Sequence, residues 1–175
     1  MAESGKVLVL LGGESTGKSS LAQALHQTLQ GEGHDAVVVP ECLRLFCETH
    51  GRTPRADEQP AIADAQTQAI AQAAGKHAIV IADTAALMTA VYSARLFGDT
   101  RLYSRAIATH RRYAVTLLMA LDLPWVADGI QRDGPMARQL IDNDLRLVLV
   151  DHDLPFSVIH GSGPARLAAA LAVAR

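Results

Sequence analysis

A glycine-rich segment near the N-terminus contains a lysine and two serines at a spacing that can bind phosphate. The segment Gly12–Ser19 reads GGESTGKS and follows the pattern G-x-x-x-x-G-K-S. The apolar run Val7–Leu11 precedes it and a helical pattern follows it, so the segment lies between a strand and a helix. Glycines allow backbone N–H groups to surround an anion, and the N-terminus of the helix adds partial positive charge. The segment is therefore predicted to be a phosphate-binding loop, or P-loop.

The P-loop chemistry predicts a nucleotide, ATP, together with Mg²⁺. Lys18 is expected to reach the β- and γ-phosphates, and the Ser19 hydroxyl is expected to ligate Mg²⁺. The predicted nucleotide-binding residues of the loop are Gly12, Gly13, Glu14, Ser15, Thr16, Gly17, Lys18, Ser19 and Ser20.

A carboxylate and an arginine follow the second apolar run, in the sequence VVVPECLRLF. Glu41 and Arg44 are three residues apart at a predicted helix start, so they share one face of the helix. Glu41 could hold a substrate hydroxyl and take its proton, while Arg44 could balance charge near the phosphates. The alternative is that Glu41 complements the helix dipole and that Arg44 is its surface partner.

A second carboxylate, Asp83, follows the third apolar run, in IVIADTAAL. A carboxylate at the end of a buried strand in a P-loop enzyme orients Mg²⁺ or its water shell, and this role is the prediction for Asp83. The alternative is that Asp83 or Thr84 caps the helix that follows.

Two further segments contain residues suited to binding. Leu123–Arg138 contains Trp125, the single tryptophan of the chain, with Arg132 and Arg138, and we predict a mobile lid whose arginines, first Arg132, cover the γ-phosphate. A solvated surface loop is the alternative. Gly161 and Gly163, after the last apolar run, could approach a flat ring and form an adenine site, or could belong to an ordinary loop.

These residues need a scaffold that gathers them, and the alternation of apolar runs with helical patterns predicts a parallel sheet with crossover helices. The predicted fold is an α/β P-loop NTPase three-layer sandwich with five parallel strands, in a single domain spanning residues 1–175. Ligands bind beyond the carboxyl ends of strands in such a sheet. The predicted strands are Lys6–Leu11, Asp35–Val39, Ala78–Ala82, Ala114–Leu121 and Phe156–His160. The predicted helices are Lys18–Leu29, Glu41–Thr49, Glu58–Ala74, Ala85–Leu96, Thr100–Arg111, Met136–Val150 and Ala165–Val173.

Composition argues against several classes of partner. The formal net charge of the 175 residues is −2, so no broad excess of Lys and Arg is available to bind nucleic acid. Cys42 and Cys47 match neither a zinc ligand set nor a disulfide framework. No apolar stretch has the length of a signal peptide or a membrane span, and the chain is expected to be cytoplasmic.

Five segments together resemble the kinase domain of NadR-type proteins, the ribosylnicotinamide kinases. In chain order they are GGESTGKSSL, PECLR, IADT, LPWVADG and VIHGSGPAR. The resemblance implies ATP-dependent phosphorylation of the 5′-hydroxyl of nicotinamide riboside, giving nicotinamide mononucleotide for NAD salvage. It also implies Mg²⁺ near Ser19 and Asp83. The residues implied to bind the riboside are Glu41, Arg44, Asp83, Trp125 and Asp128.

The chain departs from the family pattern at three positions. Cys42 replaces a usual aromatic residue, Ala85 replaces a usual Asp or Asn, and Arg132 comes one residue later than the usual arginine. Full-length NadR proteins also have an adenylyltransferase domain, and this chain is expected to lack that activity.

Two functions are therefore considered. The first is a kinase for a small nucleoside-like acceptor, which Glu41 and the arginine-bearing lid favour. The second is a nucleotide-binding switch or ATPase that acts through a protein partner, which Cys42 and Ala85 favour.

Overall fold

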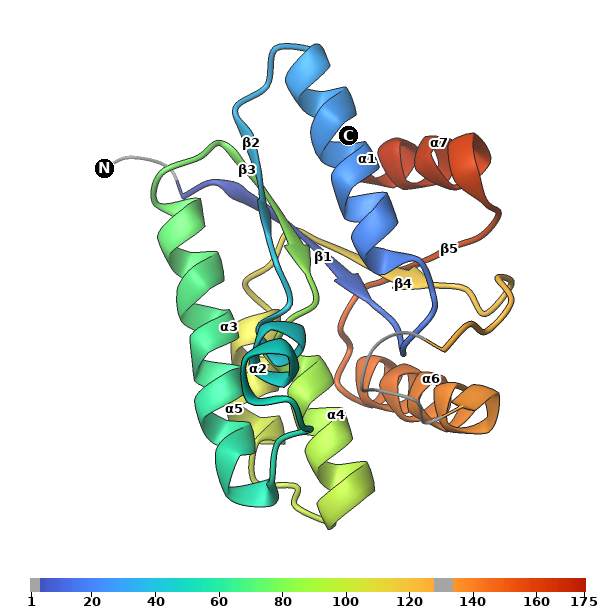
Figure 1. Cartoon of the computed structure of the whole chain (residues 1–175). Coiled ribbons are helices and arrows are strands. Elements are labelled where there is room, and N and C mark those ends of the chain that lie inside the picture. Colours follow the sequence, from blue (N-terminus) through green and yellow to red (C-terminus); the bar gives the residue numbers. More distant parts are fainter. Residues whose placement is uncertain (1–3, 128–133) are drawn as a thin grey trace.

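The described residues of this computed structural model, 4–127 and 134–175, form one five-stranded sheet with helices on both faces (Figure 1). The order of strands in the sheet is β2-β3-β1-β4-β5, and every neighbouring pair is parallel. The strands are β1 Lys6–Leu11, β2 Ala36–Val39, β3 Ile79–Asp83, β4 Val115–Met119 and β5 Ser157–Ile159. The α/β three-layer fold with five parallel strands is thus confirmed.

Every helix predicted from the sequence is present within the described residues. The helices are α1 Lys18–Gly31, α2 Cys42–His50, α3 Gln59–Ala74, α4 Ala86–Phe97, α5 Tyr103–His110, α6 Gly134–Asp151 and α7 Gly163–Ala174, and a short 3₁₀ helix, η1 Ala56–Glu58, precedes α3. The segment LRLVLVDHD, whose pattern also suits a strand, is helical up to Asp151 because Ile141, Leu145 and Leu149 bury one face of α6. None of the helices in the described ranges is both long and apolar enough to span a membrane.

Five predicted boundaries were wrong by more than one residue. Helix α1 extends to Gly31 rather than Leu29, and helix α7 begins at Gly163 rather than Ala165. Strand β4 ends at Met119 rather than Leu121, because the last pairing in this part is made by the Ala120 N–H, which donates to Ile159 O. Helix α5 begins at Tyr103 rather than Thr100, because the Asp99 side chain accepts the N–H of Arg101 and holds a turn there. Helix α6 begins at Gly134, two residues earlier than predicted.

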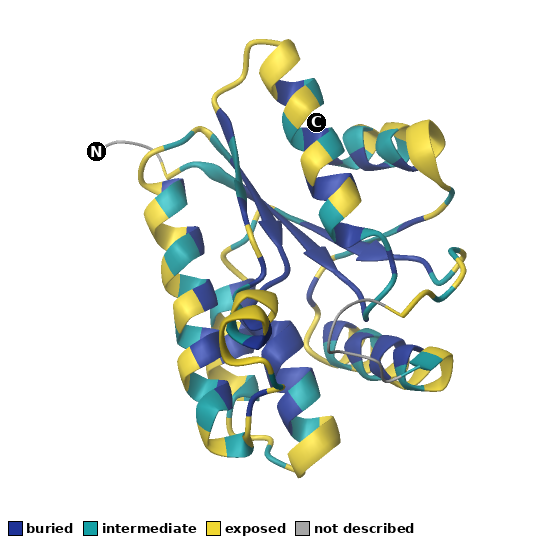
Figure 2. Cartoon of the chain, in the orientation of Figure 1, coloured by how far each residue is buried: buried dark blue, intermediate teal, exposed yellow. Residues whose placement is uncertain are grey.

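The sheet separates two hydrophobic cores, because side chains alternate between its faces along each strand. On β1, Leu8 and Leu10 pack against α1 and α7, whereas Val7, Val9 and Leu11 face the side covered by α3, α4, α5 and α6. Both faces of the central strands are therefore buried, as the coloring of the sheet in Figure 2 illustrates. This burial explains why the strands read as continuous apolar runs.

The central position of β1 decides where the P-loop lies. Strand β1 is flanked by β3 and β4, so the loop that follows Leu11 emerges at the carboxyl edge between their ends. In the β1–β3 register, Leu10 pairs with Asp83, which places this carboxylate beside the start of the P-loop. The parallel sheet thus gathers residues that are about seventy positions apart in sequence.

Candidate functional site

The P-loop between β1 and α1 has a backbone conformation that begins a helix abruptly. Gly17 is the N-cap residue of α1 and has φ of 80°, a left-handed value that favours glycine. Ser15 also has a positive φ, of 57°. Its side chain Oγ accepts a hydrogen bond from the N–H of Val126 at 2.8 Å. The segment after β4 therefore helps to hold the loop.

Lys18 is buried at the base of the loop. Its Nζ donates to the carbonyl oxygens of Gly12 at 2.7 Å and Gly13 at 3.0 Å. These contacts keep the ammonium group within the loop, where a P-loop lysine meets phosphate oxygens.

Ser19 and Asp83 form a hydroxyl–carboxylate pair next to the lysine. Ser19 Oγ donates to Asp83 Oδ2 at 2.5 Å, and Asp83 is buried at the end of β3. Its other oxygen, Oδ1, is buried without a hydrogen-bond partner among the described residues. Helix α4 begins after Ala85 with no side-chain cap, so neither Asp83 nor Thr84 caps it. The structure thus removes the capping alternative for Asp83.

Glu41 lies at the N-cap position of α2, but its side chain makes no capping hydrogen bond. The helix end is satisfied instead by Gln66 from α3, whose Oε1 accepts the N–H of Cys42 at 2.8 Å. Gln66 Nε2 also donates to Pro40 O at 3.3 Å. Because Gln66 supplies the cap, the Glu41 carboxylate is left to face the cavity beside the P-loop.

Burial dominates the electrostatics of Glu41, of which only 8% is exposed. Loss of hydration raises the pKa of Glu41, because burial disfavours the charged carboxylate. Lys18 opposes this increase, the Asp83 carboxylate adds to it, and Arg44 lowers the pKa by a smaller amount. Arg44 Nε lies 3.9 Å from Glu41 Oε2, and about half of its side chain is exposed. The surface pairing considered for Arg44 is therefore present, but its partner carboxylate is buried.

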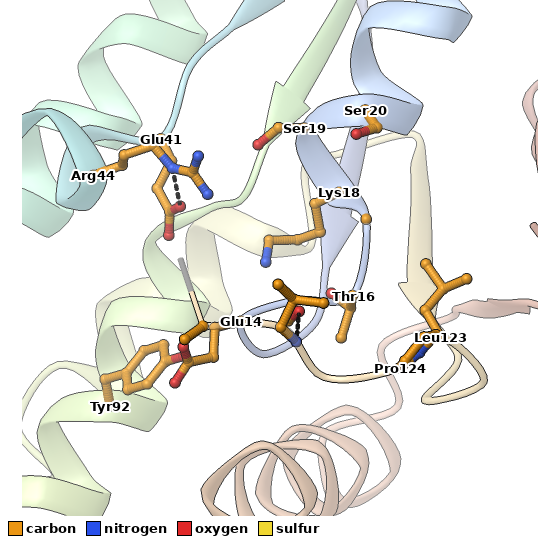
Figure 3. Close-up of a pocket in the computed structure, with 14 residues that line it drawn as sticks. Glu14, Thr16, Lys18, Ser19, Ser20, Glu41, Arg44, Tyr92, Leu123 and Pro124 are labelled. Atoms are coloured by element: carbon orange, nitrogen blue, oxygen red, sulfur yellow. Dashed lines mark hydrogen bonds and ion pairs between the residues drawn. The ribbon is translucent and has the colours of Figure 1, made fainter. Parts of the chain in front are cut away.

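A cavity of about 500 Å³ joins these groups (Figure 3). Figure 3 shows Lys18 and Glu41 pointing into the same space, with Glu14 and Tyr92 along the side formed by α4. Its lining residues are Glu14, Ser15, Thr16, Gly17, Lys18, Ser19, Ser20, Glu41, Arg44, Tyr92, Leu123, Pro124, Val126 and Ala127. The volume is in the range of pockets for small-molecule ligands.

The family of the chain follows from this loop and sheet. A family model described as an AAA domain matches residues 7–166, which include the P-loop, the sheet and the start of α7. The chain belongs to this AAA-domain family. No curated protein matches the chain by sequence.

Solved structures that share the fold of this AAA-domain protein include a NadR protein and a thymidylate kinase. A crystal structure of NadR protein in complex with NR has a TM-score of 0.75 and 21% identity, and the match covers 97% of this chain and 50% of the NadR chain. A thymidylate kinase from Ehrlichia chaffeensis has a TM-score of 0.70 and 13% identity, and the match covers 98% of this chain and 99% of the kinase. The chain thus spans half the length of the NadR chain. The fold is that of NadR-type and thymidylate-kinase-type P-loop proteins.

The structure brings together most of the site residues predicted in this AAA-domain protein. Glu14–Ser20, Glu41 and Arg44 line one cavity, and Asp83 contacts Ser19 at its edge. Asp128 and Arg132 lie outside the described residues. Trp125 is partly buried and is not among the lining residues, although its neighbours Pro124 and Val126 are.

The two glycines predicted to form an adenine site do not line this cavity. Gly161 has φ of 90°, and its N–H donates to Asp122 Oδ2 at 2.7 Å. This hydrogen bond is the largest cause that lowers the pKa of Asp122. The adenine site stays a prediction.

Three buried polar residues make contacts at the site that differ from the sequence analysis: Gln66 and Arg166 had no assigned role, and the predicted lid position of Arg138 was wrong. Gln66 interrupts the apolar series Ile62–Gln66–Ile70 on α3, and this interruption was the available signal for a buried polar contact. Arg138, considered for the lid, lies beneath the P-loop, where it donates to Ser15 O. Arg166 from α7 donates to Thr16 O. An arginine that binds backbone carbonyls leaves no pattern in sequence, so these two contacts could not be predicted.

Proposed function

We propose that this chain is an ATP-dependent kinase that phosphorylates a small nucleoside-like acceptor, nicotinamide riboside, to nicotinamide mononucleotide. The observation that carries the proposal is the buried Glu41 carboxylate, which shares a cavity with Lys18 and Ser19 and does not cap its own helix. A protein that only binds nucleotide requires no such carboxylate opposite the phosphate loop.

The nucleotide end of the cavity contains groups suited to a nucleoside triphosphate. Lys18 neutralises the β- and γ-phosphates, and loop N–H groups bind their oxygens. The hydroxyl of Ser19 and the buried, unpartnered Oδ1 of Asp83 are hard oxygen ligands of the kind that fit Mg²⁺. Mg²⁺, when bound there, offsets charge on the transferring phosphate.

At the acceptor end, Glu41 accepts the proton of the attacking hydroxyl. Its raised pKa makes the carboxylate a stronger base than an exposed glutamate, since burial disfavours its charge. Lys18 stabilises the ionised form that the reaction needs. Glu41 also orients the hydroxyl, which brings the attacking oxygen into line with the γ-phosphate.

The identity of the acceptor rests on two likenesses. The motifs GGESTGKSSL, PECLR and LPWVADG resemble those of ribosylnicotinamide kinases. The protein with a TM-score of 0.75 is NadR protein in complex with NR. We further propose that residues 1–175 act as one kinase domain in the cytoplasm, where nucleosides and ATP meet. The predicted roles of Arg132, Trp125 and Asp128 in a lid, and of Gly161 and Gly163 at the adenine, belong to the same proposal.

One experiment tests this function directly. ATP consumption is measured with a panel of nucleosides, including nicotinamide riboside, and with thymidine monophosphate as a nucleotide acceptor. We expect nicotinamide riboside to stimulate ADP formation and to yield nicotinamide mononucleotide in equal amount. If no acceptor raises ATP consumption above the rate of ATP hydrolysis measured without an acceptor, the kinase proposal fails. A nucleotide-binding switch or ATPase then becomes the better description.

A further inference from the structure

We infer that Arg138 and Arg166 are positioning residues that orient two N–H groups of the P-loop, those of Thr16 and Gly17, toward the phosphates. The inference rests on the nucleotide binding of the proposed function but is independent of the acceptor. Neither arginine lines the cavity, so each acts through the loop backbone.

The two arginines hold consecutive carbonyl groups of the loop from opposite faces of the sheet. Arg138, on α6, donates through Nη1 to Ser15 O at 3.0 Å and to Leu123 O at 3.0 Å. Arg166, on α7, donates through Nη1 to Thr16 O and through Nη2 to Ala120 O at 3.1 Å. Helix α6 covers one face of the sheet and α7 covers the other. The peptide groups Ser15–Thr16 and Thr16–Gly17 are thus fixed from two sides.

Peptide geometry converts this hold on carbonyl groups into an orientation of N–H groups. The described peptide bonds are all trans, so the C=O of one residue and the N–H of the next point in opposite directions. A carbonyl of Ser15 that points at Arg138 therefore turns the Thr16 N–H away from α6. In the same way, Arg166 turns the Gly17 N–H away from α7. Thr16 and Gly17 both line the cavity, where such N–H groups bind phosphate oxygens.

Close packing supports the same assignment. A Cβ on Gly13 would lie 3.3 Å from Arg138 Cγ, and a Cβ on Gly17 would lie 3.1 Å from Arg166 Nη1. Each arginine thus packs against a loop position that glycine leaves open. The approach of the guanidinium groups and the glycine spacing of the motif are parts of one arrangement.

Burial and charge indicate that these contacts are maintained. Only 8% of Arg138 and 3% of Arg166 is exposed, and a buried guanidinium is unfavourable without hydrogen-bond acceptors. Asp122 Oδ1 lies 2.7 Å from Arg166 Nη2 and balances its charge. To exchange their hydrogen bonds with the loop carbonyls for hydrogen bonds with water, the guanidinium groups of Arg138 and Arg166 would have to leave the protein interior. The loop is therefore oriented before the nucleotide arrives.

The test replaces each arginine with methionine, which is similar in length and has no donor, and measures binding of inorganic pyrophosphate and ADP by calorimetry. We expect each variant to lose about tenfold or more in affinity for both, the scale of a hydrogen bond to a charged group. In NMR spectra, the chemical shifts of the Thr16 and Gly17 backbone amides should change when pyrophosphate is added to the wild type. These changes should be smaller in the variants. Arg138→Lys, which keeps a charged donor group at the end of a side chain without the guanidinium fork, should recover part of the affinity.

Arg146→Met is the matched control, because Arg146 is also on α6 but pairs with Asp142 at 2.7 Å. It should bind pyrophosphate like the wild type. Gly13→Ala gives a second route if an arginine variant does not fold. Its Cβ would lie 3.3 Å from Arg138 Cγ, so the arginine side chain must shift by a few tenths of an ångström, and this shift should weaken pyrophosphate binding.

Folded Arg138→Met and Arg166→Met variants with wild-type pyrophosphate affinity would overturn the inference. Wild-type affinity in Gly13→Ala would overturn it for Arg138. A wild type that binds neither pyrophosphate nor ADP would overturn both the inference and the proposed function. Weak binding by the variants, together with a wild type that phosphorylates no acceptor, would support the inference and reject the kinase.

Discussion

The substitution Glu41→Gln tests whether the Glu41 carboxylate acts as a catalytic base or has only a structural role. Glutamine has nearly the same size, so it removes the charge and the proton acceptor without opening a hole. The helix end should survive the change, because Gln66 rather than Glu41 accepts the Cys42 N–H. We expect transfer to the acceptor to fall about a hundredfold, the usual scale for a general base. This loss corresponds to about 2.7 kcal/mol in the barrier. Affinity for ATP should stay near the wild-type value.

The same substitution should not destabilise the fold at neutral pH. The pKa of Glu41 is raised above its ordinary 4.5 by burial, so the folded state holds this proton to higher pH than the unfolded state does. Stability contributed by the protonated form is present below pH 4.5 and is lost as the pH rises toward the pKa of the folded state. Glutamine stays neutral throughout. The variant should therefore gain free energy of unfolding relative to the wild type as the pH rises from 4 to 7.

The assay combines product formation, ADP calorimetry and thermal unfolding across that pH range. Glu48→Gln is the control, because Glu48 is exposed on the same helix. It should leave the rate of product formation, the affinity for ADP and the thermal stability unchanged. Full transfer in Glu41→Gln would refute a role as base. Equal losses of ATP affinity and transfer would instead assign Glu41 to the nucleotide. A variant less stable than the wild type at pH 7 would refute the argument from burial.

Three further predictions concern other buried polar groups. Lys18→Ala should lower turnover at least about a hundredfold, because the positive charge held among the loop carbonyls is lost. The control Lys76→Ala, at an exposed position, should keep full activity. Tight ATP binding and normal turnover in Lys18→Ala would contradict the P-loop assignment. Asp83→Asn should keep the fold but raise the Mg²⁺ concentration needed for half-maximal turnover, and unchanged magnesium dependence would exclude a metal ligand. Burial lowers the pKa of His110 from 6.5 to about 4, so the unfolded state takes up a proton first as the pH falls. Urea unfolding should show that the wild type loses up to about 3 kcal/mol relative to His110→Gln as the pH falls from 6.5 to 4. The same pH dependence of stability in both proteins would contradict this prediction.

Local sequence patterns were enough to predict the parallel sheet, the P-loop and the position of Glu41 and Asp83 at the same edge of the sheet. These features depend on local patterns: a buried strand reads as an apolar run, and the P-loop motif is contiguous. The rule that parallel strands end at one edge then brings together Glu41, at the start of α2, and Asp83, at the end of β3, without any knowledge of packing. A helix over Met136–Val150 was predicted from the spacing of Ile141, Leu145 and Val148, and the structure contains it as part of α6.

The contacts made by each polar group at that edge depend on how the helices pack, which local patterns do not specify. Whether Glu41 caps α2 depends on Gln66, which is 25 residues away on a helix whose rotation is set by core packing. Arg138, a candidate for the lid, lies beneath the loop because the buried face of α6 includes it. Hydrogen bonds to backbone carbonyls require no particular residue type in the partner, so they leave no signature in the sequence of the loop. They follow from how helices dock on the sheet, which is decided by long-range packing.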